Sequence, residues 1–404
     1  MRLSVNLAAW IYCLGLGFGL GSLWLQAAWP FVVFQASMAI ALLVLTTQRK
    51  QLVARIIPNP LLVLPFLGAL IAILQIAVSG SIGNWETRQA AFEWTSYGVA
   101  AFLSNQFLQD ARLRREIVFW FAVVAVALAI VSVSLNFANP GLAWGIFETG
   151  FRDQVFGPFL YHSKFANFLE LGLGAAFWSA AMNSSRRWIA LAMAAVMVAA
   201  IVASASRGGA IVAGIEVAVL LWLFLKAQSD DSDRWFLSLA FLSAILMALC
   251  LFGTEALSNR FRSEDLAQDA RFAIQLSNLA MAKDYFWLGS GLGTWHLLYP
   301  AYARFDIGVV VNQAHNDWIQ WLIEGGLPMM AVTISILVSA CLAARKEWWG
   351  LGFVFVWIHG LLDYPMQQNP AFCALQIAFW GAALASFNHT TTKRSMDRSD
   401  LPVD

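Results

Sequence analysis

Residues 187–226 read RWIALAMAAVMVAAIVASASRGGAIVAGIEVAVLLWLFLK, a long apolar stretch whose main interruption is the segment SASRGG at 204–209. A helix of about 20 apolar residues crosses the hydrocarbon core of a bilayer. The stretch is long enough for two crossings, and the small residues around Arg207 allow a tight turn between them. It therefore predicts two membrane-spanning helices, at 187–205 and 208–226.

The composition of the whole chain agrees with this interpretation. Of its 404 residues, 60% are hydrophobic and 12% are charged, whereas a soluble domain carries about 25% charged residues. The net charge of +1 leaves no basic excess for neutralising phosphates, so no nucleic-acid partner is expected. The four cysteines lie inside apolar runs without paired spacing, which indicates neither a zinc site nor a disulfide framework. We predict an all-α, polytopic integral membrane protein.

Apolar runs separated by polar or Gly/Pro breaks indicate about twelve transmembrane helices in a single transmembrane domain, residues 1–404. Twelve helices of this length leave too little chain for a second soluble domain. Residues 389–404 are polar and charged, and we expect them to form a cytoplasmic tail. The expected spans are 5–26, 28–47, 59–79, 90–109, 116–136, 161–182, 187–205, 208–226, 235–254, 326–344, 348–362 and 370–388.

The basic residues predict the orientation of these spans. If the N-terminus is cytoplasmic, most lysines and arginines fall in connections on the cytoplasmic side, and the short outer connections contain only Arg88, Arg152, Lys164 and Arg207. Lysine and arginine are enriched in cytoplasmic loops. Both termini are therefore expected in the cytoplasm, with the membrane lipids surrounding the helices.

The connection between the ninth and tenth spans, residues 255–325, is unusually long and falls on the outer face. Its many Trp, Phe, Leu and Tyr residues favour an ordered loop over a disordered linker. Gln268, Arg271, Gln275 and Asn278 recur at helical spacing, which predicts an amphipathic helix within the loop. The segment GSGLGTW at 289–295 follows no parallel strand, so we interpret it as a tight turn and not as a nucleotide-binding loop.

Arg207, next to Ser206, is the first candidate site residue because it lies at the outer ends of two predicted spans. A guanidinium is always charged and presents a rigid fork that matches phosphate oxygens. Arg207 could therefore hold a diphosphate without a metal. The alternative is an arginine that anchors a helix end at the membrane interface.

His315 is the candidate base, and it precedes Asn316 and Asp317 at the outer start of the tenth span. An imidazole can take a proton from a hydroxyl near neutral pH, and the two neighbouring side chains could orient it or the substrate. The alternative is a satisfied structural histidine. We expect His296 and His359 to be structural.

Arg271 and Asp363 are further candidates on the same face. Arg271 belongs to the polar stripe of the predicted helix, whereas Arg260 and Arg262 lie among acidic residues and are equally consistent with solvated ion pairs. Asp363 follows the eleventh span and could contribute a carboxylate or simply end the helix. A weaker group at the outer start of the sixth span is His162, Lys164 and Asn167.

The motif S-x-S-R-G at 204–208, Arg271 followed by GSGLGTW, and HNDWIQWLIEGG at 315–326, on a chain of twelve predicted spans, resemble the O-antigen ligase and polymerase superfamily. The resemblance extends from residue 204 to about residue 370. It implies a fold similar to GT-C-type glycosyltransferases in the bacterial inner membrane. It also implies that Arg207 and Arg271 bind the diphosphate of a polyprenyl carrier and that His315 is the essential histidine, on the periplasmic face.

This resemblance predicts transfer of a glycan from undecaprenyl diphosphate to an acceptor hydroxyl. Arginines would stabilise the departing diphosphate, and a histidine base opposite it predicts an inverting reaction without a metal or cofactor. We favour ligation of O-antigen to lipid A core in lipopolysaccharide biosynthesis. Polymerisation of O-antigen or exopolysaccharide and transfer to a protein acceptor are the alternatives.

A secondary transporter or flippase is the alternative from another class, because it would also have about twelve spans. Such a protein should place ionisable groups near the bilayer midplane and in both halves of the chain. Here they gather at one face and in the second half. A structural scaffold is disfavoured by the same outer polar cluster, and the oligomeric state is not indicated by the sequence.

Overall fold

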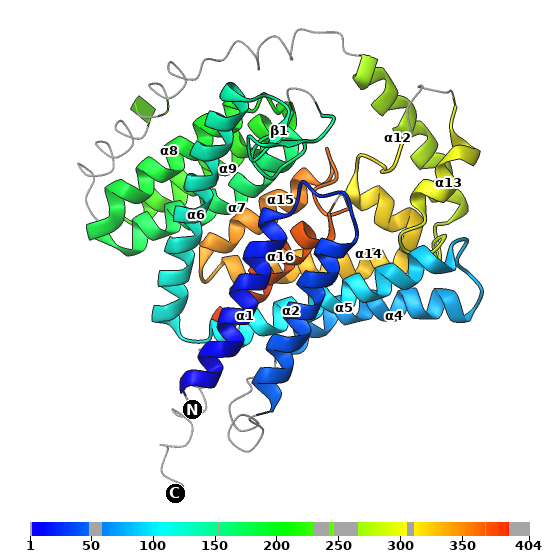
Figure 1. The fold of residues 1–404 in the computed structure, drawn as a ribbon, viewed down its shortest axis with the longest axis horizontal. Coiled ribbons are helices and arrows are strands. Elements are labelled where there is room, and N and C mark those ends of the chain that lie inside the picture. Colours follow the sequence, from blue (N-terminus) through cyan, green and yellow to red (C-terminus); the bar gives the residue numbers. More distant parts are fainter. Residues whose placement is uncertain are drawn as a thin grey trace, which may run out of the picture.

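The computed structural model describes residues 2–47, 59–151, 154–228, 242–243, 245, 266–304, 311–367 and 369–387. Almost all of the regular structure is helical (Figure 1), as predicted. Two short strands, β1 (Leu142–Ala143) and β2 (Phe147–Glu148), pair antiparallel within a connection. The long helices are α1 (Arg2–Gly21), α2 (Trp29–Thr46), α4 (Leu64–Ala77), α5 (Asn84–Phe107), α6 (Ala111–Ala138), α7 (His162–Met182), α8 (Arg187–Ala203), α9 (Arg207–Lys226), α12 (Leu266–Asp284), α14 (Asp317–Ala344) and α16 (Pro370–Leu384), with the shorter α13 (Trp295–Tyr302) and α15 (Leu351–His359).

Helices form at eleven of the twelve predicted spans, and the range 235–254 lies almost entirely outside the described residues. Within the described ranges, seven helices are long and apolar enough to cross a membrane. They are α2, the 3-10 turn at Pro60–Val63 together with α4, α6, the turn at Ser184–Arg186 together with α8, α9, α14 and α16 with its last turn. A multi-pass all-α membrane protein is therefore confirmed, and the number twelve stays a prediction.

Helix α7 lies at the centre of one half of the bundle, against α6, α8, α9 and α15. Every residue from Lys164 to Ala180 is buried, which is the pattern of a helix surrounded by protein. A Cβ added at Gly174 would lie 2.5 Å from the carbonyl oxygen of Trp349. Glycine therefore allows the backbone before α15 to approach α7 closely, as small residues do between membrane helices.

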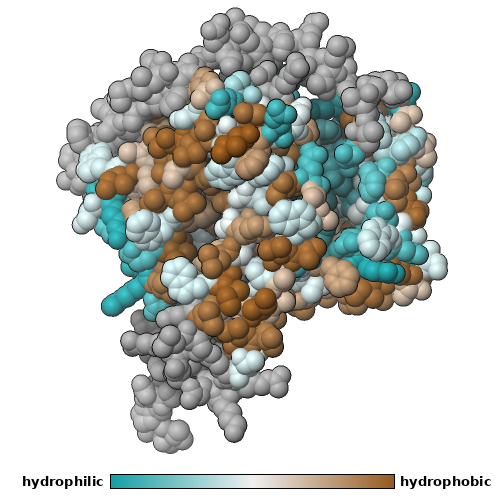
Figure 2. Space-filling view, in the orientation of Figure 1, coloured by the Kyte–Doolittle hydropathy of each residue, from teal (hydrophilic) through white to brown (hydrophobic). Residues whose placement is uncertain are grey.

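Helices α4, α5 and α16 form the second group, and the N-terminal α1 and α2 pack together beside them (Figure 1). Hydrophobic side chains cover the middle of the face shown in Figure 2, over α1 and α2. Hydrophilic side chains gather on the right of that view, beside α12 and α13. This division is expected for a bundle within lipid that carries an external helical loop.

The predicted amphipathic helix of the long outer loop is present as α12. Its stripe is not simply solvated, because Gln275 and Asn278 both donate hydrogen bonds of 2.9 Å to the carbonyl oxygen of Ala314. The stripe therefore fixes the segment that precedes α14. Arg271, in the same stripe, is exposed.

The GSGLGTW segment is a tight turn, as predicted, with positive φ at Gly289, Gly291 and Gly293. The carboxylate of Glu324 accepts hydrogen bonds from the backbone N–H groups of Gly293 and Trp295, at 3.0 and 3.1 Å. Two residues later α14 is interrupted at Gly326, where φ is 61° and ψ is −162°. The turn at 289–295 and the break at Gly326 hold the outer loop against the start of the tenth predicted span.

Candidate active site

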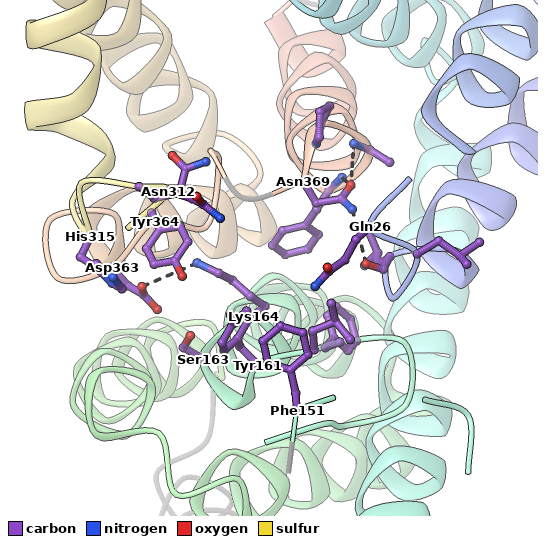
Figure 3. A pocket seen from close by; sticks show the side chains of 18 of the residues that line it. Gln26, Phe151, Tyr161, Ser163, Lys164, Asn312, His315, Asp363, Tyr364 and Asn369 are labelled. Carbon is purple, nitrogen blue, oxygen red and sulfur yellow. Dashed lines mark hydrogen bonds and ion pairs between the residues drawn. The ribbon is translucent and has the colours of Figure 1, made fainter. Parts of the chain in front are cut away.

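One cavity of about 1680 Å³ lies at the end of the bundle where α1 and α15 end and where α2, α7, α9 and α16 begin. Each of the six connections that the sequence predicts to be outer contributes residues to its wall. Representative residues from the six, in chain order, are Gln26, Trp85, Phe151, Arg207, His315 and Asp363. Figure 3 shows His315, Asp363, Tyr364 and Lys164 together on one side of the cavity, with Gln26 and Asn369 on the other.

Arg207 reaches the cavity from the turn between α8 and α9. Ala205 has a φ of 55°, a left-handed conformation that is uncommon for a residue other than glycine. Ser206 then caps α9, because its hydroxyl accepts a hydrogen bond of 3.1 Å from the backbone N–H of Gly209. The half-buried Arg207 is the first residue of α9, at the positive end of the helix dipole.

His315 also lines the cavity and has a positive φ, 53°. Its ring stands edge-on against the Tyr364 ring, with 4.6 Å between ring centres. Its Nδ1 is buried and has no hydrogen-bond partner among the described residues. Burial, reinforced by the positive charges of Arg271 and Lys164, lowers the pKa of His315 to about 4. The imidazole is therefore neutral at physiological pH.

Lys164 and Asp363 form an ion pair in the wall beside His315, with 3.6 Å between Nζ and Oδ1. The Lys164 ammonium also lies 3.6 Å from the centre of the Tyr364 ring, a cation–π contact. Burial alone would raise the pKa of Asp363, but the neighbouring Lys164 and His359 outweigh this effect, and the pKa lies well below its usual range. Asp363 is thus a permanent carboxylate.

The structure brings together five of the seven residues that the sequence predicts for the site: Ser206, Arg207, Arg271, His315 and Asp363 all line the cavity. Asn316 and Asp317 are not in its wall. Asn316 caps α14 by accepting a 3.0 Å hydrogen bond from the backbone N–H of Ile319. The buried Asp317 accepts from the backbone N–H groups of Met366 and Gln367, at 3.0 and 3.2 Å. These three hydrogen bonds fix the backbone around the cavity.

Lys164 and Tyr364 are closer to the centre of the site than their sequence context indicates. A lysine two residues after the start of a predicted span is ordinarily an interfacial anchor. Its burial follows from the central position of α7, which a single amphipathic pattern does not reveal. The sequence does contain one indication of its importance, because Lys164 is one of the few basic residues in the predicted outer connections.

Residues 192–334 match the family model described as O-antigen ligase. This match confirms the predicted relationship to the O-antigen ligase and polymerase superfamily. The matched segment contains Arg207, Arg271 and His315, whereas Lys164 and Asp363 lie outside it. A comparison with curated proteins found no match. The match supports a glycosyltransferase-like membrane enzyme that acts on lipid-linked glycans.

Proposed function

We propose that this protein transfers a glycan from undecaprenyl diphosphate to an acceptor hydroxyl at the periplasmic face of the bacterial inner membrane. The observation that carries the proposal is the convergence of Arg207, Arg271 and His315 on one cavity. They come from α9, α12 and the segment before α14. Two guanidiniums and a neutral imidazole at one site match a diphosphate leaving group and a base.

In the proposed reaction, the acceptor oxygen attacks the anomeric carbon as the bond from that carbon to the diphosphate oxygen breaks. The electron pair of the broken bond stays on the diphosphate, where Arg207, Arg271 and the ammonium of Lys164 stabilise the added charge. The proton of the acceptor hydroxyl passes to His315. Attack opposite the leaving group inverts the anomeric configuration, and none of these steps requires a metal.

The low pKa of His315 makes it a weak base before the donor binds. A bound diphosphate adds negative charge near the imidazole, and negative charge raises the pKa of a neighbouring histidine. The donor would therefore strengthen the base that its own transfer requires. The same coupling keeps His315 a weak base while no donor is bound.

The size and opposite wall of the cavity suit carbohydrate substrates. At about 1680 Å³ it exceeds the roughly 300–1,000 Å³ typical of small-molecule pockets. The side formed by the first helices and α5 is lined by the amide groups of Gln26, Gln35 and Gln89, the indole of Trp85 and the carboxyl group of Glu93. Amide and carboxyl groups hydrogen-bond to hydroxyls, and an indole offers an apolar face to a sugar ring.

Ligation to lipid A core is the favoured subfunction, and polymerisation or transfer to protein would use the same chemistry. The test is transfer by the purified protein from an undecaprenyl-diphosphate-linked glycan, in the presence of a chelator, to lipid A core, to a second glycan and to a protein acceptor. Product with one acceptor class identifies the subfunction. Donor consumption with none of them, or uptake of the donor into vesicles without transfer, would favour the transporter alternative.

A further inference from the structure

His359 is the last residue of α15, and the proposed reaction leaves it without a role. It is 1% exposed and lines the same cavity as Arg207 and His315. The sequence predicts it to be structural. Its two ring nitrogens, however, face different surroundings, and these surroundings indicate a function in the site.

The Nδ1 of His359 faces the interior of the bundle. It lies 2.8 Å from Oε1 of Glu170, which is fully buried on α7. An ionised carboxylate only accepts hydrogen bonds, so Nδ1 carries a proton. The amide of Asn167 is 2.7 Å from the same nitrogen, and its Oδ1 otherwise has no partner among the described residues. With Oδ1 turned toward Nδ1, both acceptors share that N–H.

The Nε2 of His359 faces the turn that carries Arg207. A Cβ added at Gly208 would lie 2.9 Å from Nε2, so only glycine at this position lets the imidazole approach so closely. Gly208 follows Arg207 directly, and both residues line the cavity. Nε2 therefore lies beside the turn whose arginine is proposed to hold the diphosphate.

The charge of this pair follows from its burial. A carboxylate that is taken out of water without a positive partner is strongly unfavourable. His359 forms the ion pair with Glu170 in the described part of the chain, and its positive charge also acts on Asp363, whose pKa it helps to lower. An imidazolium with Nδ1 bonded to Glu170 presents its second N–H at Nε2.

We propose that His359, held as an imidazolium by Glu170, is a further donor-binding residue that donates Nε2–H to an oxygen of the diphosphate next to Arg207. This inference rests on the proposed function. Glu170 and Asn167 are positioning residues, because they act only through His359. A Cβ at Gly352 would lie 2.9 Å from the carbonyl oxygen of Glu170, so the close approach of α7 and α15 keeps the pair together.

The competing explanation is a purely structural ion pair between α7 and α15. Two substitutions separate the roles of the ring nitrogens. The amide of asparagine reaches the position of Nδ1, so His359→Asn keeps the contact with Glu170 and removes the group at Nε2. The longer glutamine reaches the position of Nε2, so His359→Gln restores a donor there.

The experiment measures binding of undecaprenyl diphosphate to the full-length protein in detergent micelles, together with the thermal unfolding midpoint. We expect His359→Asn to weaken binding about tenfold or more, as for loss of one charged hydrogen bond. Its midpoint should also fall, because the Glu170 carboxylate loses its positive partner, and His359→Gln shares this loss of charge. We expect His359→Gln to recover part of the affinity. Glu170→Gln should weaken binding as well, because the imidazole then loses its counter-charge.

Arg207→Ala distinguishes failure of this inference from failure of the proposed function. Binding that is lost in Arg207→Ala and unchanged in a folded His359→Asn would overturn the role of His359 alone. Absence of binding to the native protein would overturn both. If His359→Asn does not fold, Glu170→Gln decides by the same criterion: unchanged affinity contradicts the proposal, and weaker affinity at an unchanged midpoint supports it.

Discussion

The Nζ of Lys164 and the Oδ1 of Asp363 lie 3.6 Å apart in the wall of the cavity, and both side chains are less than a tenth exposed. The pair joins the start of α7 to the segment that follows α15. It lies outside the segment that matches the O-antigen ligase family. Because the pair is buried in the wall of the cavity, its loss should affect the stability of the protein as well as donor binding.

Removal of one partner of this pair should destabilise the protein. Lys164→Met leaves the Asp363 carboxylate buried without its cation, which costs about 3–5 kcal/mol when one half of a buried ion pair is removed. The double variant Lys164→Met/Asp363→Leu should recover much of that loss. Thermal unfolding in detergent checks both, and equal midpoints for the native protein and Lys164→Met would contradict the account.

Loss of either cavity arginine should slow transfer more than it alters folding. We expect Arg207→Ala and Arg271→Ala each to lower the turnover rate about 10²–10³-fold, the loss typical of removing one group that stabilises developing negative charge. Arg304→Ala is the control, because Arg304 is exposed and outside the cavity wall. An Arg271→Ala rate equal to that of Arg304→Ala would remove Arg271 from the site.

The pH dependence of transfer should report His315. Only the neutral imidazole accepts a proton, so activity should fall as the pH drops through the pKa of His315. In the free enzyme that pKa is about 4, and it governs kcat/KM for the donor. The proposed diphosphate donor should raise this pKa when it binds, so the acidic limb of kcat should lie at higher pH. Acidic limbs at the same pH for kcat and kcat/KM, or limbs that remain in the His315→Gln variant, would disprove the coupling.

The break in α14 should depend on glycine. A Cβ at Gly326 would lie 2.5 Å from the carbonyl oxygen of Trp287, and φ there is 61°. Gly326→Ala should therefore lower the yield of folded protein and the thermal midpoint. Gly214→Ala in α9 is the matched control, because no atom lies within 4 Å of its added Cβ. Similar midpoints for the two variants would show that the break tolerates a side chain.

Much of the fold follows from the sequence because an apolar run of membrane length has few alternatives to a transmembrane helix. The turn around Arg207 and the helix that carries Arg271 are both where spacing predicts them, since a polar break or stripe in an apolar chain is a strong local signal. The prediction that alternate connections share one face agrees with their meeting at one cavity. Which side of the membrane that face occupies stays a prediction.

The partners of the site residues were beyond the reach of local patterns. Asn316 and Asp317 stand beside His315 in sequence, yet one caps a helix and the other binds backbone N–H groups. The contact between Glu170 and His359 joins residues 189 positions apart. Such pairings depend on how α7 and α15 pack. A single sequence does not show which residues of the two helices come into contact.

His315 is proposed as the base in transfer from a polyprenyl diphosphate donor. The most direct measurement is the single-turnover rate of glycan transfer by native protein, His315→Ala and the exposed control His296→Ala, with donor binding measured in parallel. We expect a rate about 10²–10⁴-fold lower for His315→Ala, with donor binding retained and the control unaffected. A His315→Ala rate equal to that of His296→Ala would contradict it.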